Sequence, residues 1–432
     1  MTLENIPGIS ACVVKNQEVV WSNAYGIADF ETNTPVETTT LFTVASISKL
    51  FVATAVMQVY EDGLIDLDTD INEYLYFEVK NPNFPNNPLT IRQLLRHRSS
   101  LRDPEGDMYD YWEEGDHSAD LHDFLENILT PTGDNYQASY YNSNAGPGNS
   151  QWYSNIGFSL LAVIIEQVTD MPFHTYCQSN IFDLLCMENT TFFWSETDIS
   201  NTAMPHRRVN GEYQALGRYS IALYPSALIK TNVIELANFL LAYTGRGTVD
   251  GVQLLESSSV DLLTPYDFTS ENLGWWNGTN WTFTFHFPDD EVWFHGGYMP
   301  GIRARMNYYP DDSTGVIILT NGEGQYGWIE EELAANIADF VTNAPTELPC
   351  QISDIDTDEK TVLKIYPSIS SGSFTIETTE VKDLKIYDIS GQKILYQASS
   401  DLKSIELSKK GLFLLEIETD TGEIQVEKII VY

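Results

Sequence analysis

The chain has 432 residues, 43% of them hydrophobic, and carries 62 acidic against 23 basic side chains, for a formal net charge of −39. This length suits two or three domains, and the hydrophobic share is enough to bury a core. So acidic a molecule repels phosphate backbones and anionic lipid, which argues against nucleic acid as a partner. No run of about 18 apolar residues occurs, so the sequence predicts no membrane span. We interpret the acidity as a solvated surface suited to salty or cold water rather than as an acidic ligand site.

The first elements that the sequence predicts are a β-hairpin and a helix. Residues 9–14 and 18–22 alternate as strands around a turn at Lys15-Asn-Gln. The apolar stretch from Leu50 to Tyr60 has helical period and stops at Glu-Asp-Gly63. No signal peptide is recognisable before the first strand, and we expect a leader to be missing from this sequence.

The tetrapeptide Ser46-Ile-Ser-Lys49 opens that helix. Residues i and i+3 of a helix share a face, so the lysine amine is expected within reach of the serine hydroxyl. A neighbouring amine whose pKa is lowered by burial is one of the few groups able to activate a serine. Ser-x-x-Lys also occurs at Ser390 and Ser400, but both lie in a strand-rich tail, where i and i+3 point to opposite faces. The first copy is therefore the candidate nucleophile and base.

Further helices are predicted in the middle of the chain. A short helix with a threonine cap is predicted over residues 89–97, and others over 119–129, 156–168 and 232–244. The polar stretch from Asp103 to Gly148 surrounds the second of these, and loops of this size are usually functional or disordered. Its acidic residues lack the spacing of a calcium loop, and we predict neither a metal nor a cofactor.

The last part of the chain is strand-rich. Residues 275–321 alternate as strands, and a final helix is predicted over 327–343. Strands at both ends with helices between them predict an α+β fold, in which an antiparallel sheet is flanked by helices with a helical subdomain. We place this first domain at residues 1–348, a linker at 349–360 and a small β-sandwich at 361–432.

Two further segments complete a candidate acyl-transfer site. Tyr153-Ser-Asn155 precedes a predicted helix; a tyrosine near a lysine can shuttle protons, and an asparagine can bind an amide or ester. Tyr140-Tyr-Asn142 fits the same pattern but has no helix behind it. His295-Gly-Gly297 follows a strand-like run, and its glycines allow close approach of a substrate to the backbone. The amide of Tyr298 is then placed to face an oxyanion.

The order of these three motifs resembles the serine β-lactamase and penicillin-binding-protein superfamily, in particular its class C-like esterase and D-peptidase branch. The resemblance covers about residues 5–343, and flanking segments agree with it: 43–49, 94–101, 147–148, 181–187 and 297–301. It implies that Ser46 is acylated, that Lys49 and Tyr153 share general-base and general-acid duty, and that the amides of Ser46 and Tyr298 form the oxyanion hole. It also implies that Asn155 binds the substrate carbonyl. Which of Lys49 and Tyr153 takes the first proton stays open.

One position departs from the penicillin-processing members. His295 stands where they place a lysine that helps to bind the substrate carboxylate. A mostly neutral imidazole is a weaker anchor for an anion, so the sequence favours esters or amides over β-lactams. Arg98-Ser-Ser and Ser226-Ala-Leu depart from the family pattern as well, which affects loop shape rather than the nucleophile.

The tail resembles the C-terminal sorting domain of type IX secretion in Bacteroidetes. The matching segments are Ile365-Tyr-Pro367, 372–376, 384–393, 410–417 and the terminal Lys428-Ile-Ile-Val431. The resemblance implies export to the cell surface or medium, with the secretion machinery as partner.

The sequence leaves several alternatives open. A D-aminopeptidase, a DD-carboxypeptidase or a β-lactamase is the second enzymatic reading, and a non-catalytic surface binding protein is a third. Cys12, Cys177, Cys186 and Cys350 allow up to two disulfides with three connectivities, or four buried free thiols.

Overall fold

The computed structural model describes residues 6–103, 112–264, 276–277, 292–323 and 334, and eight strands of the tail. Two compact units are distinguished: Ile6–Ala338, and Asp339–Tyr432 with the first five residues. The predicted helix over 327–343 lies outside the described residues except for Ala334, which is helical and buried. The predicted linker and Cys350 also lie outside them.

The larger unit is built on an antiparallel sheet in the order β12-β13-β14-β15-β1-β2-β3. β1 pairs with both β2 and β15, so segments from the two ends of this unit meet in the sheet, as predicted. The strands are β1 (Gly8–Lys15), β2 (Glu18–Asp29), β3 (Thr34–Pro35), β12 (Trp276–Asn277), β13 (Trp293–Met299), β14 (Ile302–Tyr309) and β15 (Thr314–Thr320).

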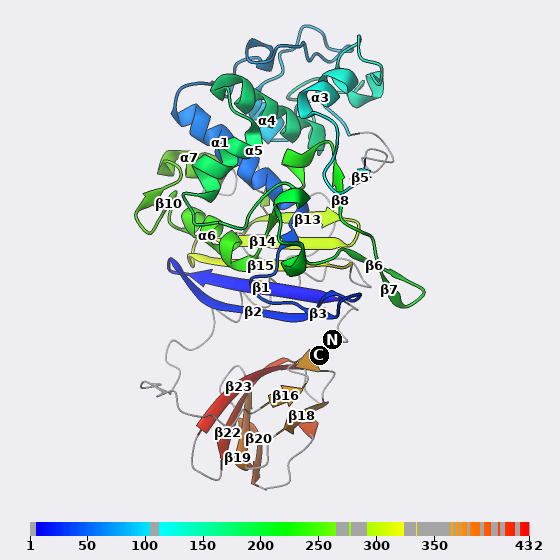
Figure 1. Cartoon of the computed structure of the whole chain (residues 1–432). Coiled ribbons are helices and arrows are strands. Elements are labelled where there is room, and N and C mark those ends of the chain that lie inside the picture. The colour runs from blue at the N-terminus through cyan, green and yellow to red at the C-terminus, as the bar shows by residue number, and fades with distance from the viewer. Residues whose placement is uncertain are drawn as a thin grey trace. The chain divides into compact units, whose positions relative to one another are not determined.

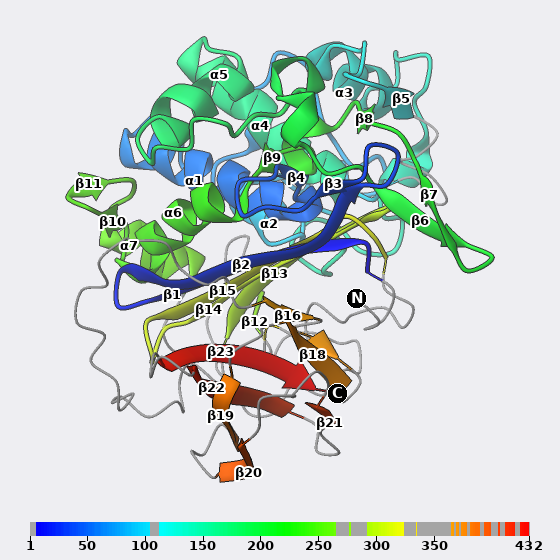
Figure 2. The same cartoon turned by 60° about the horizontal axis from the view of Figure 1, so that its bottom comes forward.

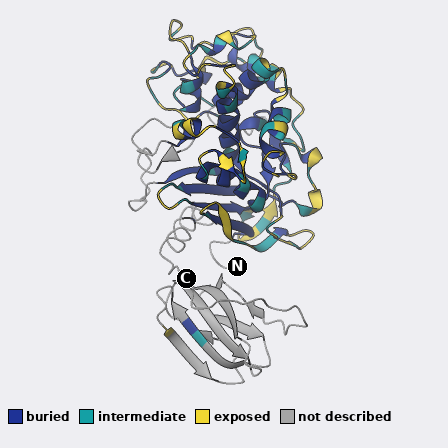
Figure 3. Ribbon diagram, turned by 90° about the vertical axis from the view of Figure 1, so that its left-hand side faces the viewer, coloured by how far each residue is buried: buried dark blue, intermediate teal, exposed yellow. Residues whose placement is uncertain are grey.

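A layer of helices covers one face of this sheet (Figures 1 and 2). Helix α6 packs on β1 and β15, and the short 3-10 turn η1 packs on β13. Figure 3 shows the buried residues gathered where the helices meet the sheet. The helices are α1 (Ser48–Glu61), α2 (Ile91–Leu95), α3 (Leu121–Leu129), α4 (Asn155–Thr169), α5 (Phe173–Cys177), α6 (Val233–Thr244) and α7 (Ser257–Leu263), with η1 at Ala45–Ile47 and η8 at Tyr224–Ser226.

Four short two-stranded sheets lie outside the main sheet among the described residues of this unit. They are β4 (Phe42–Thr43) with β9 (Lys230–Thr231), β5 (Trp112–Glu114) with β8 (Tyr219–Ile221), β6 (His206–Val209) with β7 (Glu212–Ala215), and β10 (Thr248–Val249) with β11 (Val252–Gln253).

Local sequence signals explain the ends of these elements. Asn16 and Gln17 both have positive φ, as the two central residues of a tight hairpin turn require, and they join β1 to β2. Thr90 and Gln93 form a reciprocal capping box that starts α2. Helix α1 is apolar on all sides rather than on one stripe, and it is accordingly buried along most of its length. The structure confirms the predicted hairpin and each of the helices that the sequence predicts before residue 245.

The described cysteines are free thiols. Cys12 and Cys177 are buried, and Cys186 is exposed, so these three form no disulfide with one another. Within the described residues no single helix has the length and apolarity for a membrane span; α4 and the segment Phe173–Phe182 meet the test only as a pair bent by 80°.

The described part of the tail consists of strands. One sheet has the order β16-β18-β21 and the other β17-β23-β22-β19-β20. The strands are β16 (Lys364–Tyr366), β17 (Ile369–Ser370), β18 (Ser373–Glu377), β19 (Val381–Asp388), β20 (Lys393–Ala398), β21 (Ile405–Glu406), β22 (Gly411–Thr419) and β23 (Ile424–Val431). The strand-rich character is as predicted, while the packing of the two sheets as a sandwich stays a prediction.

Candidate active site

Ser46 lies in η1, two residues before α1 begins at Ser48. Ala45 precedes it with a φ of 46°, a left-handed conformation that is costly for alanine and that recurs at functional sites. Strand β13 runs directly beside this turn, because a Cβ added at Gly297 would lie 2.2 Å from the carbonyl oxygen of Val44. Only glycine permits this close approach of strand to turn.

In its ammonium form Lys49 donates three hydrogen bonds, which is its full capacity. The acceptors are Ser46 Oγ at 3.2 Å, Asn155 Oδ1 at 2.5 Å and the carbonyl oxygen of Ser226 at 2.8 Å. Lys49 is completely buried, and this desolvation lowers its pKa to about 7, against an opposing influence of Asp103. A substantial fraction of the amine is therefore neutral near pH 7 and able to accept the serine proton.

Tyr153 stands beside the same pair of side chains. Its hydroxyl is hydrogen-bonded to Ser46, and Lys49 Nζ lies 4.8 Å from the centroid of its ring. Although 40% of the residue is exposed, protein surrounds its hydroxyl, and this burial raises its pKa despite the bond to Ser46. The phenol is therefore protonated near neutral pH and can donate a proton in this state.

Asn155 is the first residue of α4, where its side chain links the lysine to a carboxylate. Its Oδ1 accepts from Lys49, and its Nδ2 donates to Asp103 Oδ2 at 2.7 Å. The same carboxylate accepts from the backbone N–H groups of Asn155 and Ile156, at 2.9 Å and 3.1 Å. A carboxylate at a helix N-terminus satisfies amides that have no partner within the helix.

Two buried imidazoles border the lysine. His295 Nδ1 lies 2.8 Å from the Gly296 carbonyl oxygen, which only accepts, so Nδ1 carries the proton and Nε2 is an acceptor. His97 Nδ1 accepts the Ser154 N–H at 3.1 Å, and its ring stacks on Tyr153 at a centroid distance of 4.4 Å. Burial and the nearby Lys49 lower the pKa of His295 to about 3 and that of His97 well below its usual range. Both rings are therefore neutral at physiological pH.

Two arginines of β14 lie on the other face of the sheet from this site. The guanidinium of Arg305 lies 3.8 Å from the ring centroid of Phe294, and that of Arg303 lies 3.6 Å from that of Tyr298. Alternation along β13 places both aromatic residues on the face opposite to His295 and Gly297. These guanidinium groups are therefore not directed at Ser46.

The structure thus brings together residues that lie far apart in the sequence. Ser46, Lys49, Tyr153 and Asn155 form one hydrogen-bonded cluster, with His295 beside it. Gly297 contacts the turn that carries Ser46, while the Tyr298 side chain is exposed.

The alternative pair Tyr140 and Asn142 lies elsewhere: the Asn142 carbonyl oxygen accepts from Asn81, and its Oδ1 accepts from the amides of residues 144 and 145. Sequence reasoning treated Asp103 only as the start of a polar loop, and it treated Ser226 only as a departure in loop shape. It noted His97 only within a matching segment. The one available signal for Asp103 was its position two residues after the matching segment 94–101.

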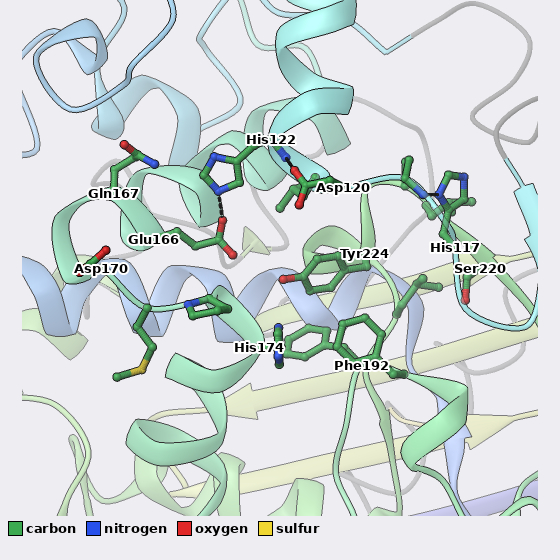
Figure 4. A pocket seen from close by; sticks show the side chains of 18 residues that line it. His117, Asp120, His122, Glu166, Gln167, Asp170, His174, Phe192, Ser220 and Tyr224 are labelled. Carbon is green, nitrogen blue, oxygen red and sulfur yellow. Dashed lines mark hydrogen bonds and ion pairs between the residues drawn. The ribbon is translucent and has the colours of Figure 1, made fainter.

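A cavity of about 490 Å³ is lined in part by Tyr224 and Leu228, and Ser46, Lys49 and Tyr153 are not among its lining residues (Figure 4). The Ser226 carbonyl faces Lys49, whereas Tyr224 lines the cavity. Two acidic groups of its wall are engaged: Glu166 bonds to His122 and to the Phe173 N–H, and Asp120 caps α3. No group of three or more potential metal ligands occurs among the described residues. This cavity is therefore separate from the serine site.

Comparison with known proteins agrees with the fold. Residues 1–339 match the family model described as Beta-lactamase, and residues 364–432 match the model of the Secretion system C-terminal sorting domain. The chain belongs to the β-lactamase and penicillin-binding-protein-like family of serine hydrolases and carries a C-terminal secretion sorting domain.

Individual relatives are distant. The chain is 24% identical to Penicillin-binding protein 4* of Bacillus subtilis over 446 residues, covering 96% of this chain and 90% of that protein. It is 23% identical to Protein flp of Staphylococcus aureus over 327 residues, which is 74% of this chain and 61% of that protein's length. Among solved structures, D-amino acid amidase from Ochrobactrum anthropi SV3, complexed with L-phenylalanine amide, matches with a TM-score of 0.61 and 20% identity, covering 78% and 94% of the two chains. At this identity the structural match supports the fold alone.

Proposed function

We propose that this protein is a secreted serine hydrolase that cleaves ester or amide bonds through a Ser46 acyl-enzyme, with esters as the preferred substrates. The observation that carries the proposal is the position of the Lys49 amine, 3.2 Å from Ser46 Oγ, in an environment that lowers its pKa to about 7. The hydroxyl of Tyr153 on the same serine supplies the partner for proton transfer.

The proposed reaction uses these groups in sequence. Ser46 Oγ attacks the acyl carbon and passes its proton to the Lys49 and Tyr153 pair. The pair then returns this proton to the leaving alcohol or amine as its bond to the acyl carbon breaks. Water next attacks the acyl-enzyme in the same way, which frees the acid and restores the serine proton. The pair acts as one unit, so neither residue is assigned the first proton transfer.

In this mechanism the backbone amides of Ser46 and Tyr298 stabilise the oxyanion. The argument for this role is the close packing of β13 on the turn that carries Ser46, which only glycine at position 297 allows. Asn155 is proposed to contact the substrate carbonyl with the second N–H of its amide, because the first one is donated to Asp103.

Several observations favour neutral substrates over β-lactams. The imidazole that replaces the lysine of penicillin-processing relatives is buried and neutral, so it supplies no positive charge for a substrate carboxylate. Arg303 and Arg305, the cations of the neighbouring strand, lie on the opposite face of the sheet. Neither the His295 imidazole nor these two guanidinium groups therefore offers a positive charge to a substrate carboxylate in the site.

The test is covalent labelling of the nucleophile. A fluorophosphonate is expected to add its mass to the peptide that contains Ser46, and Ser46→Ala is expected to abolish both labelling and ester hydrolysis. Ser390→Ala, in the second Ser-x-x-Lys copy, is the matched control and is expected to retain both. Absence of an adduct, or an adduct that persists in Ser46→Ala, refutes the proposal and favours a binding protein with a relic site.

A D-aminoacyl amide or peptide is the second candidate substrate, and one observation favours it. His295 Nε2 is buried, is an acceptor and has no hydrogen-bond partner among the described residues. It therefore suits an N–H donor of a substrate, such as an amide or ammonium group. A panel of short and long acyl esters, D-aminoacyl amides and a chromogenic cephalosporin separates these candidates, and failure of a labelled penicillin to bind Ser46 excludes the penicillin-recognising alternative.

The C-terminal sorting domain indicates a secreted or cell-surface protein. We propose that type IX secretion machinery is the partner that recognises residues 364–432. Deletion of these residues is expected to leave the hydrolase inside the cell, as fractionation with an antibody against the larger unit will detect. Export of the truncated protein at the normal level contradicts this role.

A further inference from the structure

Asp103 makes more hydrogen bonds to the catalytic region than any capping function alone requires. Its carboxylate accepts from Ser154 Oγ at 3.2 Å, from the backbone N–H of Asn155 at 2.9 Å and from that of Ile156 at 3.1 Å. It also accepts from the side chain of Asn155, whose Nδ2 lies 2.7 Å from Oδ2. This last bond has no counterpart in an ordinary helix cap.

The bond to Nδ2 determines which end of the amide faces the lysine. With Nδ2 on Asp103, Asn155 Oδ1 points to the Lys49 amine at 2.5 Å. The opposite orientation would place an N–H donor against the ammonium group and an oxygen against the carboxylate, both of which are unfavourable. Asp103 therefore selects the single orientation in which Asn155 accepts from Lys49.

The orientation of Asn155 in turn constrains the lysine. Asn155 Oδ1 and the Ser226 carbonyl accept two N–H groups of Lys49, and the remaining position on Nζ is directed at Ser46 Oγ: an N–H in the ammonium form and the lone pair in the neutral form. We propose that Asp103 is a positioning residue for acylation of Ser46, which orients the Asn155 amide and thereby holds the Lys49 amine against the nucleophile. This inference rests on the proposed function and adds a residue that touches neither the substrate nor the serine.

The groups around Lys49 support a second consequence, on its charge. Asp103 acts on the amine from the N-terminus of α4, and it raises the pKa that burial lowers. The other titratable groups that face the lysine are His97, His295 and Tyr153, and all three are uncharged near neutral pH. Removing the Asp103 charge therefore lowers the pKa of Lys49, because the ammonium form loses its stabilising carboxylate.

Asp120 provides a matched control. It caps α3 and accepts the backbone N–H groups of His122 and Asp123, at 2.9 Å and 3.1 Å, without contacting the serine site. If Asp103 were only a helix cap, substituting either aspartate would reduce stability and leave the chemistry unchanged.

The first experiment compares Asp103→Asn with Asp120→Asn. Both are expected to lower the thermal unfolding midpoint. In single-turnover acylation by p-nitrophenyl acetate between pH 5 and 9, Asp103→Asn is expected to reduce the plateau rate about ten- to a hundredfold, because the lysine loses its alignment. The same variant is expected to shift the midpoint of the pH profile downward, while Asp120→Asn changes neither quantity. Equal acylation behaviour of the two variants overturns the inference.

A second readout does not depend on catalysis. In protein labelled with [ε-¹³C]lysine, the Lys49 resonance is assigned by its loss in Lys49→Met, and its titration gives the lysine pKa directly. The titration midpoint is expected to fall in Asp103→Asn and to stay in place in Asp120→Asn. An unchanged midpoint in Asp103→Asn overturns the inference, even if Ser46 of the wild type proves not to be acylated. Failure of the proposed function alone shows instead as missing acylation with the expected shift in titration.

Discussion

Among the residues that the structure describes, Lys49 and Lys230 are completely buried, and the difference between these two lysines shows what makes a buried amine chemically useful. Desolvation lowers the pKa of both Lys49 and Lys230 to about 7. The Lys230 amine donates to the Phe192 carbonyl at 2.5 Å and lies 4.5 Å from the ring centroid of Trp194. Lys49 instead bonds to a serine hydroxyl and to an asparagine that a carboxylate orients. Burial alone thus produces a basic amine, and the neighbouring groups determine whether it has a reaction to perform.

The largest expected difference between the two lysines is in activity. Lys49→Met is expected to reduce kcat/KM for p-nitrophenyl acetate by about a thousandfold or more, because the serine loses its base. Lys230→Met is expected to change it less than threefold, since no nucleophile contacts that amine among the described residues. Steady-state kinetics of the two variants measures this, and a comparable loss in both would break the distinction.

The pH dependence of hydrolysis sharpens the same comparison. Lys49 must be neutral to accept the serine proton, and its pKa is about 7. The kcat/KM is therefore expected to fall about tenfold per pH unit below 7 and to level off above it. His295, with a pKa of about 3, adds no transition between pH 5 and 9. The same pH midpoint is expected in Lys230→Met. If the midpoint disappears in that variant, the titrating group is Lys230 and not Lys49.

A pair of adjacent glycines tests how closely the Lys49 region is packed. Gly297→Ala is expected to reduce kcat/KM at least tenfold, because its Cβ would lie 2.2 Å from the Val44 carbonyl and displace β13 from the turn of Ser46. At Gly296 the nearest atom to an added Cβ is Arg305 Nη1 at 3.8 Å, which is ordinary contact. Gly296→Ala is therefore expected to stay within about threefold of the wild type. Equal losses of kcat/KM in the two variants would show that the close approach of β13 to the turn of Ser46 does not determine activity.

Lys230→Met has the smallest expected effect on activity, and its effect on the free energy of unfolding is measurable. Below pH 7 Lys230 is charged in both states, and its full burial cost destabilises the fold. Between about 7 and 10.4 only the unfolded state holds the proton, so this cost falls as pH rises. Lys230→Met is therefore expected to raise the free energy of unfolding by a few kcal/mol at pH 6, and by less at pH 9. Denaturant titrations of variant and wild type at both pH values measure this, and a pH-independent difference contradicts it.

The sequence was informative where function depends on local geometry. Ser46 and Lys49 are three residues apart at the start of an apolar helix, and such a spacing brings side chains together in almost any fold. The structure refines this only slightly, since the serine lies in a 3-10 turn and the α-helix begins two residues later. The hairpin of β1 and β2 and the cap of α2 were likewise readable, because the turn and capping residues act within a few positions.

Other features depended on contacts that no spacing reveals. Tyr140 and Tyr153 share the Tyr-x-Asn spacing, and only the helix predicted after Tyr153 favoured it; the fold shows that Tyr153 meets Ser46, while Tyr141, next to Tyr140, donates to the Leu129 carbonyl. The role of Asp103 was equally hidden, because its partners lie 51 to 53 residues away.

By itself, the sequence determined the fold class, the family and the residues Ser46, Lys49, Tyr153, Asn155 and His295 as candidates, since motifs and periodicity are local properties of the chain. Only the tertiary structure decided the charge states of these groups. A lysine amine becomes a base near pH 7, and an imidazole stays neutral, because packing removes water from them. Burial is a property of the assembled fold, and two lysines with equal burial differ in chemistry only through the neighbours that the fold supplies.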